Sequence, residues 1–165
     1  MRRAKQTRPV LGGGKTPTRR DVLVGAAVLG TSSMLPSKRA AADDRTPQFI
    51  DAYKKLVGDR QPTETGVKLD MPDLAENGNM VPFSVAVESP MTGAQYVKSI
   101  TILSTGNPQP VIATFTLSPA SGRALISGRL RLARSQDVLA VAELNTGEWV
   151  SGTANVNVTV GGCGG

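Results

Sequence analysis

The residue with the clearest chemical potential is Cys163, the single cysteine of this 165-residue chain. Two glycines stand on each side of it: Gly161, Gly162, Gly164 and Gly165. Glycine loses the most conformational entropy on ordering, so four glycines favour a flexible arm over a packed chain end. Cys163 follows the last residue of an alternating run, Val160, by three positions, so its Cα can lie roughly 10 Å from the folded body. The pattern predicts a carrier arm at residues 161–165 that presents one thiol.

The sequence around Cys163 offers nothing that would activate this thiol. No Lys, Arg or His lies close to it in the chain, and no helix N-terminus directly precedes it. Its pKa is therefore expected near or above ~8.5, which leaves only a minor thiolate fraction at neutral pH. Such a thiol suits a covalent carrier whose cargo is attached and processed by other proteins. We expect no catalytic residue in this chain, and hence not an enzyme.

Composition excludes most other chemistries. The chain has no histidine, which removes imidazole ligands and Ser-His-Asp or Cys-His catalysis. One cysteine is too few for an internal disulfide or a thiolate zinc cluster. One Trp, two Tyr and three Phe are too few for a base-stacking surface. We expect no metal site, no cofactor and no nucleic-acid partner.

Three other interpretations of the chain end stay open. Cys163 could form a disulfide with another chain, as an odd cysteine in an exported structural or adhesion module does. Gly164 and Gly165 could form a ubiquitin-like tail that is activated at its carboxylate. The tail could also be disordered, with an incidental cysteine.

The net charge of +6 comes from the N-terminal segment of the chain. Residues 1–42 hold nine basic residues and one acid, whereas residues 43–165 hold ten basic and twelve acidic residues. The twin arginine, Arg19 and Arg20, precedes an apolar run at 22–35, and small residues end at Ala42. This order predicts a Tat-type signal peptide over 1–42, cleavage after Ala42 and a periplasmic mature protein.

A Sec signal and a basic disordered arm are the alternatives for this leader. Its apolar run of about 14 residues covers about 21 Å as a helix, less than the ~30 Å hydrocarbon core. We therefore expect no stable membrane anchor.

Two kinds of periodicity predict the elements that position the arm. Residues 43–65 form a helix and a loop: Thr46 caps it, Pro47 takes the first position, Gly58 ends it, and one apolar stripe faces the core. The stripe consists of Phe49, Ile50, Tyr53, Leu56 and Val57.

The period changes to two from residue 66 onward. Apolar or alternating runs lie at 67–71, 81–87, 95–104, 111–117, 124–132, 138–144, 148–150 and 154–160. Turn residues separate them, so the fold class is all-β: an immunoglobulin-like antiparallel β-sandwich of about seven strands over 66–160. Arg123, Arg129 and Arg131 share one strand face, which we expect to be solvated; an anion or partner patch is the alternative.

Several short motifs, together with the glycine-flanked cysteine, resemble the thiosulfate-oxidation carrier family SoxY. The resemblance covers the leader and roughly residues 77–165. Its motifs are 78–82 (GNMVP), 89–92 (SPMT), 96–97 (YV), 107–108 (NP), 113–115 (ATF), 121–124 (SGRA), 129–133 (RLRLA), 140–143 (AVAE) and the terminal GGCGG. Val22 stands where Tat leaders more often carry Phe, and residues 43–76 contribute little.

The resemblance implies a periplasmic immunoglobulin-like subunit that forms a heterodimer with SoxZ. The carrier cysteine then corresponds to Cys163, with Gly161, Gly162, Gly164 and Gly165 as its swinging arm. It further implies that a c-type cytochrome complex conjugates thiosulfate to the thiol as a cysteine S-thiosulfonate. A manganese-dependent hydrolase releases sulfate, and in many members a sulfur dehydrogenase oxidises the remaining sulfane sulfur.

Overall fold

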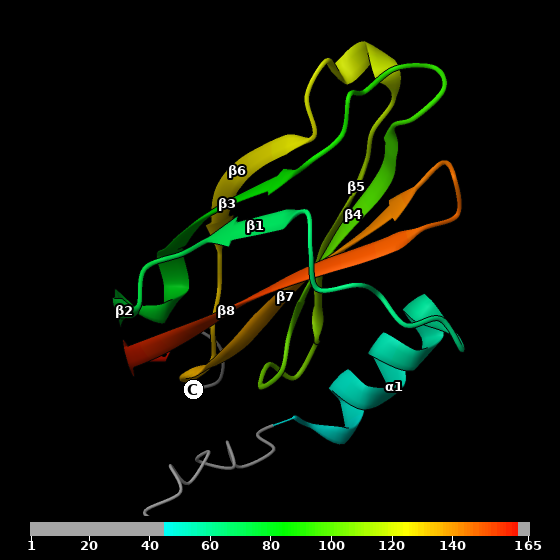
Figure 1. Cartoon of the computed structure of the whole chain (residues 1–165). Coiled ribbons are helices and arrows are strands. Elements are labelled where there is room, and N and C mark those ends of the chain that lie inside the picture. The colour runs from blue at the N-terminus through cyan, green and yellow to red at the C-terminus, as the bar shows by residue number, and fades with distance from the viewer. Residues whose placement is uncertain (1–44, 162–165) are drawn as a thin grey trace, which may run out of the picture. The chain divides into compact units, whose positions relative to one another are not determined.

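Two β-sheets packed face to face make up the body of the computed structural model, which describes residues 45–161 (Figure 1). The smaller sheet has the order β1 (Val67–Asp70), β3 (Val81–Val87), β6 (Leu125–Leu130). The larger has the order β2 (Leu74–Asn77), β8 (Trp149–Val160), β7 (Gln136–Leu144), β4 (Val97–Ser104), β5 (Val111–Thr116). All strand pairs are antiparallel except β2 with β8. The predicted all-β sandwich is confirmed.

The alternating residues of the strands build the core between the sheets. In β3, Val81, Phe83, Val85 and Val87 are all buried, as their period of two predicts. The continuous apolar run of β7 is buried on both faces, because one face lies in the core and the other lies against a helix. These two faces explain why no alternation is visible in its sequence.

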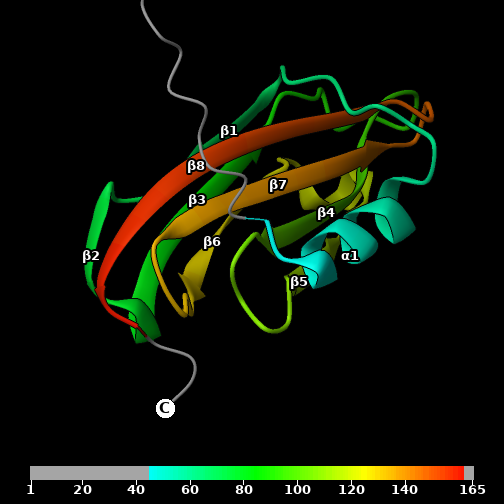
Figure 2. The same ribbon diagram turned by 90° about the horizontal axis from the view of Figure 1, so that it is seen from below.

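That helix, α1 (Pro47–Val57), covers the outer face of the larger sheet (Figure 2). Phe49 and Val57 are buried against Leu103 of β4 and against Leu139 and Val141 of β7. Burial raises the pKa of Tyr53 on the same helix, against the opposing effect of the Arg45 charge. The helix therefore closes a second, smaller core on the side of the sheet away from the first.

The predicted ends of α1 are confirmed, and its predicted stripe is partly wrong. The Thr46 hydroxyl accepts a hydrogen bond from the Phe49 N–H (3.3 Å), and Gly58, at φ 62°, donates from its N–H to the Lys54 carbonyl (2.8 Å). Ile50, however, is 50% exposed. Only one side of a helix can face a flat sheet, and the buried residues Phe49 and Val57 define that side.

Strand boundaries differ from the predictions at two places. The predicted runs at 148–150 and 154–160 form one strand, β8, which passes through Gly152. A Cβ at Gly152 would lie 2.7 Å from the Val67 carbonyl oxygen, so the glycine allows a close approach of β1 and does not end a strand. Strand β2 was not predicted, and η1 (Gly78–Met80), a short 3-10 turn, follows it.

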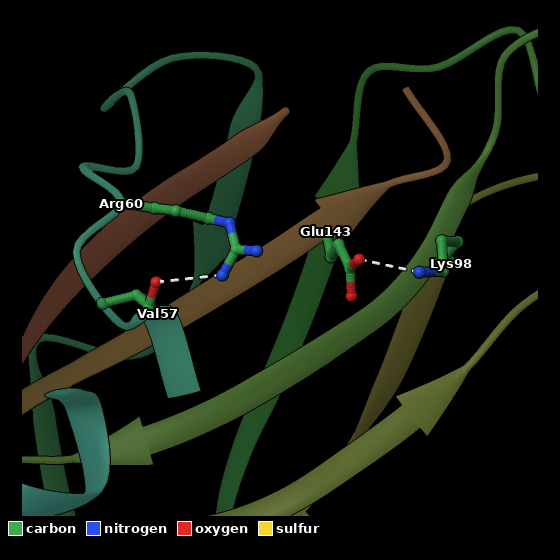
Figure 3. A network of polar contacts seen from close by, with 4 residues as sticks. All are labelled: Val57, Arg60, Lys98 and Glu143. Carbon is green, nitrogen blue, oxygen red and sulfur yellow. Dashed lines mark hydrogen bonds and ion pairs between the residues drawn. The ribbon is translucent and has the colours of Figure 1, made fainter. Parts of the chain in front are cut away.

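Two polar contacts lie near the surface of the larger sheet, one between strands and one after the helix. Figure 3 shows Lys98 of β4 donating to Glu143 of β7 (2.7 Å), and Arg60 donating to the Val57 carbonyl (3.4 Å). The Arg60 guanidinium also lies 5.6 Å from the ring centre of Trp149. The Lys98–Glu143 pair is solvent-accessible, so its contribution to stability is about 0.2–1 kcal/mol.

The predicted leader lies outside the described residues. Arg19, Arg20 and the expected cleavage after Ala42 therefore stay predictions. Between residues 45 and 161, no helix has the length and apolar character needed to cross a membrane.

Candidate functional site: the base of the carrier arm

The described part of the predicted carrier arm is its first residue, Gly161. Cys163, Gly162, Gly164 and Gly165 lie outside the described residues, and their role stays a prediction. The structure does show where the chain leaves the sandwich and what holds it there. The site is therefore built from the residues around Gly161.

The chain reaches Gly161 at the end of β8, the longest strand. Val160 pairs with Asn77 of β2 on one side, and Figure 2 shows β8 ending beside β2 and η1. On the other side, the Val158 N–H donates to the hydroxyl of Ser135, the residue before β7 (2.8 Å). This bond extends the contact of β8 past its last β7 pair. Val160 is 61% exposed and Gly161 is exposed. The strand thus brings Gly161 to the surface at a fixed position.

Residues 131–135, the arm-base loop, form the surface against which Gly161 lies. Leu132 is fully buried, and its N–H donates to the Gly78 carbonyl (2.8 Å). A Cβ built on Gly161 would overlap the carbonyl oxygen of Ala133. Glycine is therefore required here for close backbone approach, which is a separate reason from the flexibility inferred from the sequence.

Two buried side-chain amides fix the arm-base loop. Asn107 is 6% exposed, donates to the Arg131 carbonyl (2.9 Å) and accepts from the Ala133 N–H (2.9 Å). Gln136 is 2% exposed, donates to the Asn107 side-chain oxygen (2.8 Å) and accepts from the Gly106 N–H (2.6 Å). No buried side-chain nitrogen or oxygen in the described part of the chain lacks a hydrogen-bond partner. This satisfied network gives the loop one conformation.

Sequence reasoning did not single out Asn107, Ser135 and Gln136 as residues of the site. Asn107 stood out only as part of the Asn-Pro motif at 107–108, and Gln136 lies just before the predicted run at 138–144. A polar amide directly before a run of buried residues was the available signal, because such a side chain needs a partner. The partner, 29 positions away, is visible only in the fold.

The described part of this site is a fixed exit point for the chain at Gly161. Among residues 45–161, no group of three or more His, Cys, Asp or Glu side chains is placed to hold a metal ion. Strand β8 brings the chain to this point, Gly161 is exposed, and the hydrogen-bonded arm-base loop lies directly against it.

Comparison with solved structures places this architecture in a known class. The sulfur carrier protein SoxY from Chlorobium limicola f thiosulfatophilum is similar over 66% of this chain and 89% of its own, with 27% identity and a TM-score of 0.55. A superoxide reductase (neelaredoxin) from Ignicoccus hospitalis is similar over 57% of this chain and 80% of its own, with 16% identity and a TM-score of 0.51. The second likeness shows the fold alone. No curated protein matches the chain.

The fold and the arm base define a small β-sandwich of the sulfur-carrier class. The model of the family "Sulfur oxidation protein SoxY" matches residues 53–163, a range that includes Cys163. The chain belongs to the SoxY family, and its role is that of a carrier in sulfur oxidation.

Proposed function

We propose that the protein carries the intermediates of thiosulfate oxidation as covalent adducts of Cys163. The observation that carries this proposal is the family match that runs from the body through Cys163, joined to a strand that ends at Val160 and is followed by the exposed Gly161. The single thiol then lies two residues beyond a fixed exit point. At most about 7 Å of chain separates the Cα atoms of Gly161 and Cys163.

The loading step is an oxidation that the carrier itself does not perform. The Cys163 thiol and thiosulfate lose two electrons and one proton and form a sulfur–sulfur bond, which gives an S-thiosulfonate. A c-type cytochrome partner is the electron acceptor. Water then cleaves the terminal sulfonate as sulfate in a manganese-dependent hydrolase, and a persulfide remains on Cys163. A sulfur dehydrogenase then removes six electrons from that sulfur, passes them to a cytochrome acceptor and adds three oxygens from water. A second hydrolysis releases sulfate and restores the thiol.

The proposal includes a location and a subunit partner. Arg19 and Arg20 direct export by the Tat route to the periplasm, with cleavage after Ala42. A SoxZ-like subunit forms the heterodimer. The Tat route exports folded complexes, so it would carry a SoxZ that lacks a signal of its own.

Intact-mass analysis of the protein from cells oxidising thiosulfate tests the proposal. We expect a thiosulfonate or sulfane-sulfur adduct on the peptide that contains Cys163, and its removal by a reductant. Cells without a sulfur substrate provide the control. An unmodified thiol under active oxidation, or an obligatory disulfide to another chain that resists loading, would contradict the carrier role.

Gly161→Val tests the close approach at the arm base. The new Cβ would overlap the Ala133 carbonyl, so the arm must leave the body in a different direction. We expect the rate at which partner enzymes process the Cys163 adduct to fall about tenfold or more, because the adduct is displaced from its reactive position. The free energy of unfolding should change by less than about 1 kcal/mol, since Gly161 follows the last strand residue. Partner-coupled turnover and urea unfolding measure the two effects.

Thr159→Ala is the matched control, because Thr159 is an exposed β8 residue two positions earlier. Its turnover should equal that of the unmodified protein. A Gly161→Val protein with full turnover would show that the close approach does not direct the arm.

A further inference from the structure

Strand β5 is an edge of the larger sheet, with β4 on one side and no strand between residues 45 and 161 on the other (Figure 1). The other strands at sheet ends all carry charge. Strand β1 has Lys68 and Asp70, and β2 has Glu76. Strand β6 has Arg129, which is exposed as predicted. Charged side chains on edge strands oppose pairing with further chains. In β5, whose sequence is VIATFT, no residue is charged, so this edge of the described structure lacks that protection.

The backbone groups of Thr114 and Thr116 face the open edge of β5. Leu117, directly after the strand, donates its N–H to the Lys98 carbonyl (2.9 Å), so the backbone of Leu117 faces β4. Successive residues of an antiparallel strand direct their N–H and C=O groups to opposite sides. Phe115 therefore bonds to β4, whereas Thr114 and Thr116 point away from it. The register shift of this strand pair lies beyond these residues, near the start of β5, so the edge at the two threonines is regular.

The side chains at this edge separate into an apolar face and a hydroxyl face. Phe115 and Leu117 are half-buried and pack against the main core. Thr114 and Thr116 are exposed on the opposite face, where the Thr114 hydroxyl lies 3.2 Å from that of Thr101 on β4. A strand with this pattern is complementary to itself in the antiparallel orientation, because apolar residues then meet apolar residues and threonines meet threonines. No like charges oppose each other in such a pair.

We infer that the β5 edge binds the β5 edge of a second copy of this chain, with a two-fold axis at Phe115. In this register Thr114 of each copy pairs with Thr116 of the other, and each pair exchanges two backbone hydrogen bonds. Phe115 lies opposite Phe115 of the second copy in a close, non-hydrogen-bonded position, where two aromatic rings attract each other. Ala113 lies opposite Leu117 of the second copy, so a small side chain faces a large one. The larger sheets of the two copies then form one continuous sheet.

This pairing leaves the exit of the carrier arm accessible in both copies. The sheet order places β4 and β7 between β5 and β8, so Gly161 lies away from the contact. The contact involves no cysteine, and it therefore differs from a disulfide between two Cys163 residues. It is limited to residues 113–117 of each copy, so we expect a reversible dimer of the small, transient class. The inference is independent of the carrier role, because it rests on β5 alone.

Sedimentation velocity of the full chain, with Cys163 alkylated so that no disulfide can form, tests the pairing. We expect the dimer fraction to rise reversibly with protein concentration. Thr114→Pro should weaken association about tenfold or more, because it removes an edge-facing N–H from each copy. The bonds to β4 should stay intact, since an edge strand tolerates proline where its nitrogen faces solvent. In the unmodified chain, hydrogen exchange at the Thr116 amide should slow about tenfold as the dimer forms.

A charge exchange identifies the surface independently of proline. Thr114→Lys/Thr116→Lys places like charges opposite each other in the dimer and should abolish self-association, as should Thr114→Glu/Thr116→Glu. A mixture of the lysine and glutamate variants should associate at low salt at least about tenfold more tightly than either variant alone. Thr153→Lys/Asn155→Lys is the matched control, because these two residues are exposed with the same spacing on β8. The control should dimerise like the unmodified chain.

Two results would overturn the self-pairing directly: an unmodified chain that is monomeric at every concentration, or a dimer that persists in the lysine variant. The edge could instead be occupied by the SoxZ-like subunit. In that case the unmodified chain would stay monomeric alone, and the lysine variant would lose its binding to that subunit. This result would assign the edge to the other subunit and would also overturn the self-pairing.

Discussion

Replacing Cys163 with serine is expected to abolish thiosulfate oxidation that depends on this protein. A serine hydroxyl cannot form the sulfur–sulfur bond on which every proposed intermediate depends, so no adduct can be loaded. The fold should be unaffected, because β8 ends at Val160, three residues earlier. We expect the free energy of unfolding to change by no more than about 0.5 kcal/mol. Substrate-dependent oxygen uptake with partner proteins and urea unfolding measure the two quantities.

Gly164→Ala is the control for this experiment, since it keeps the thiol and changes the residue beside it. It should still accept cargo. The mass gained on loading should be the same, on a peptide that is heavier by one methylene group. A Cys163→Ser protein that sustains full thiosulfate oxidation would refute the carrier role. A variant that instead loses a stable dimer, with no loss of oxidation, would favour the structural or adhesion module.

Asn107→Ala is expected to lower the free energy of unfolding by about 2–5 kcal/mol. The substitution removes one side chain that serves three groups: the Arg131 carbonyl, the Ala133 N–H and the Gln136 amide. Each buried polar group left without a partner costs about 1–3 kcal/mol, partly offset where water enters. The midpoint of urea unfolding should fall while the slope is unchanged. The arm-base loop should also become more mobile, as faster hydrogen exchange at Leu132 and Ala133 would show.

Asn155→Ala provides a control with the same chemical change at an exposed site. The Asn155 amide donates to Asp137 (2.7 Å) in contact with solvent. Water can replace this bond, so we expect a loss below about 1 kcal/mol. Equal destabilisation by the two variants would show that the buried amides do not hold the loop.

The parts of the fold that depend on local chemistry could be predicted from sequence. Thr46, Pro47 and Gly58 fix the ends of α1 through short-range hydrogen bonds and backbone angles, and all three predictions are confirmed. The alternation of apolar residues in β3 predicted which of its faces is buried, because a strand presents successive side chains to opposite sides. The exposure of Ile50 could not be predicted, since it depends on where the sheet lies.

The parts that depend on distant partners could not be predicted. Strand β2 is short and polar, and the main chain of β8 supplies its pairing. The runs at 148–150 and 154–160 were predicted as separate, since the reason for Gly152 between them, the close approach of Val67, comes from a residue 85 positions earlier in the sequence. Likewise, Cys163 and its glycines were visible as a candidate arm, whereas Asn107 and Gln136, which fix the base of that arm, were not.

The position of β8 between two neighbours has a mechanical consequence. Strand β7 pairs with it from Trp149 to Val156, and β2 pairs with it from Asn157 to Val160. The hydrogen bonds of the antiparallel ladder run perpendicular to the strand. A pull on the chain end along this axis therefore loads many bonds in shear and does not peel them one by one. An enzyme that draws the terminus into a deep channel can apply tension without unravelling the body to which it is attached.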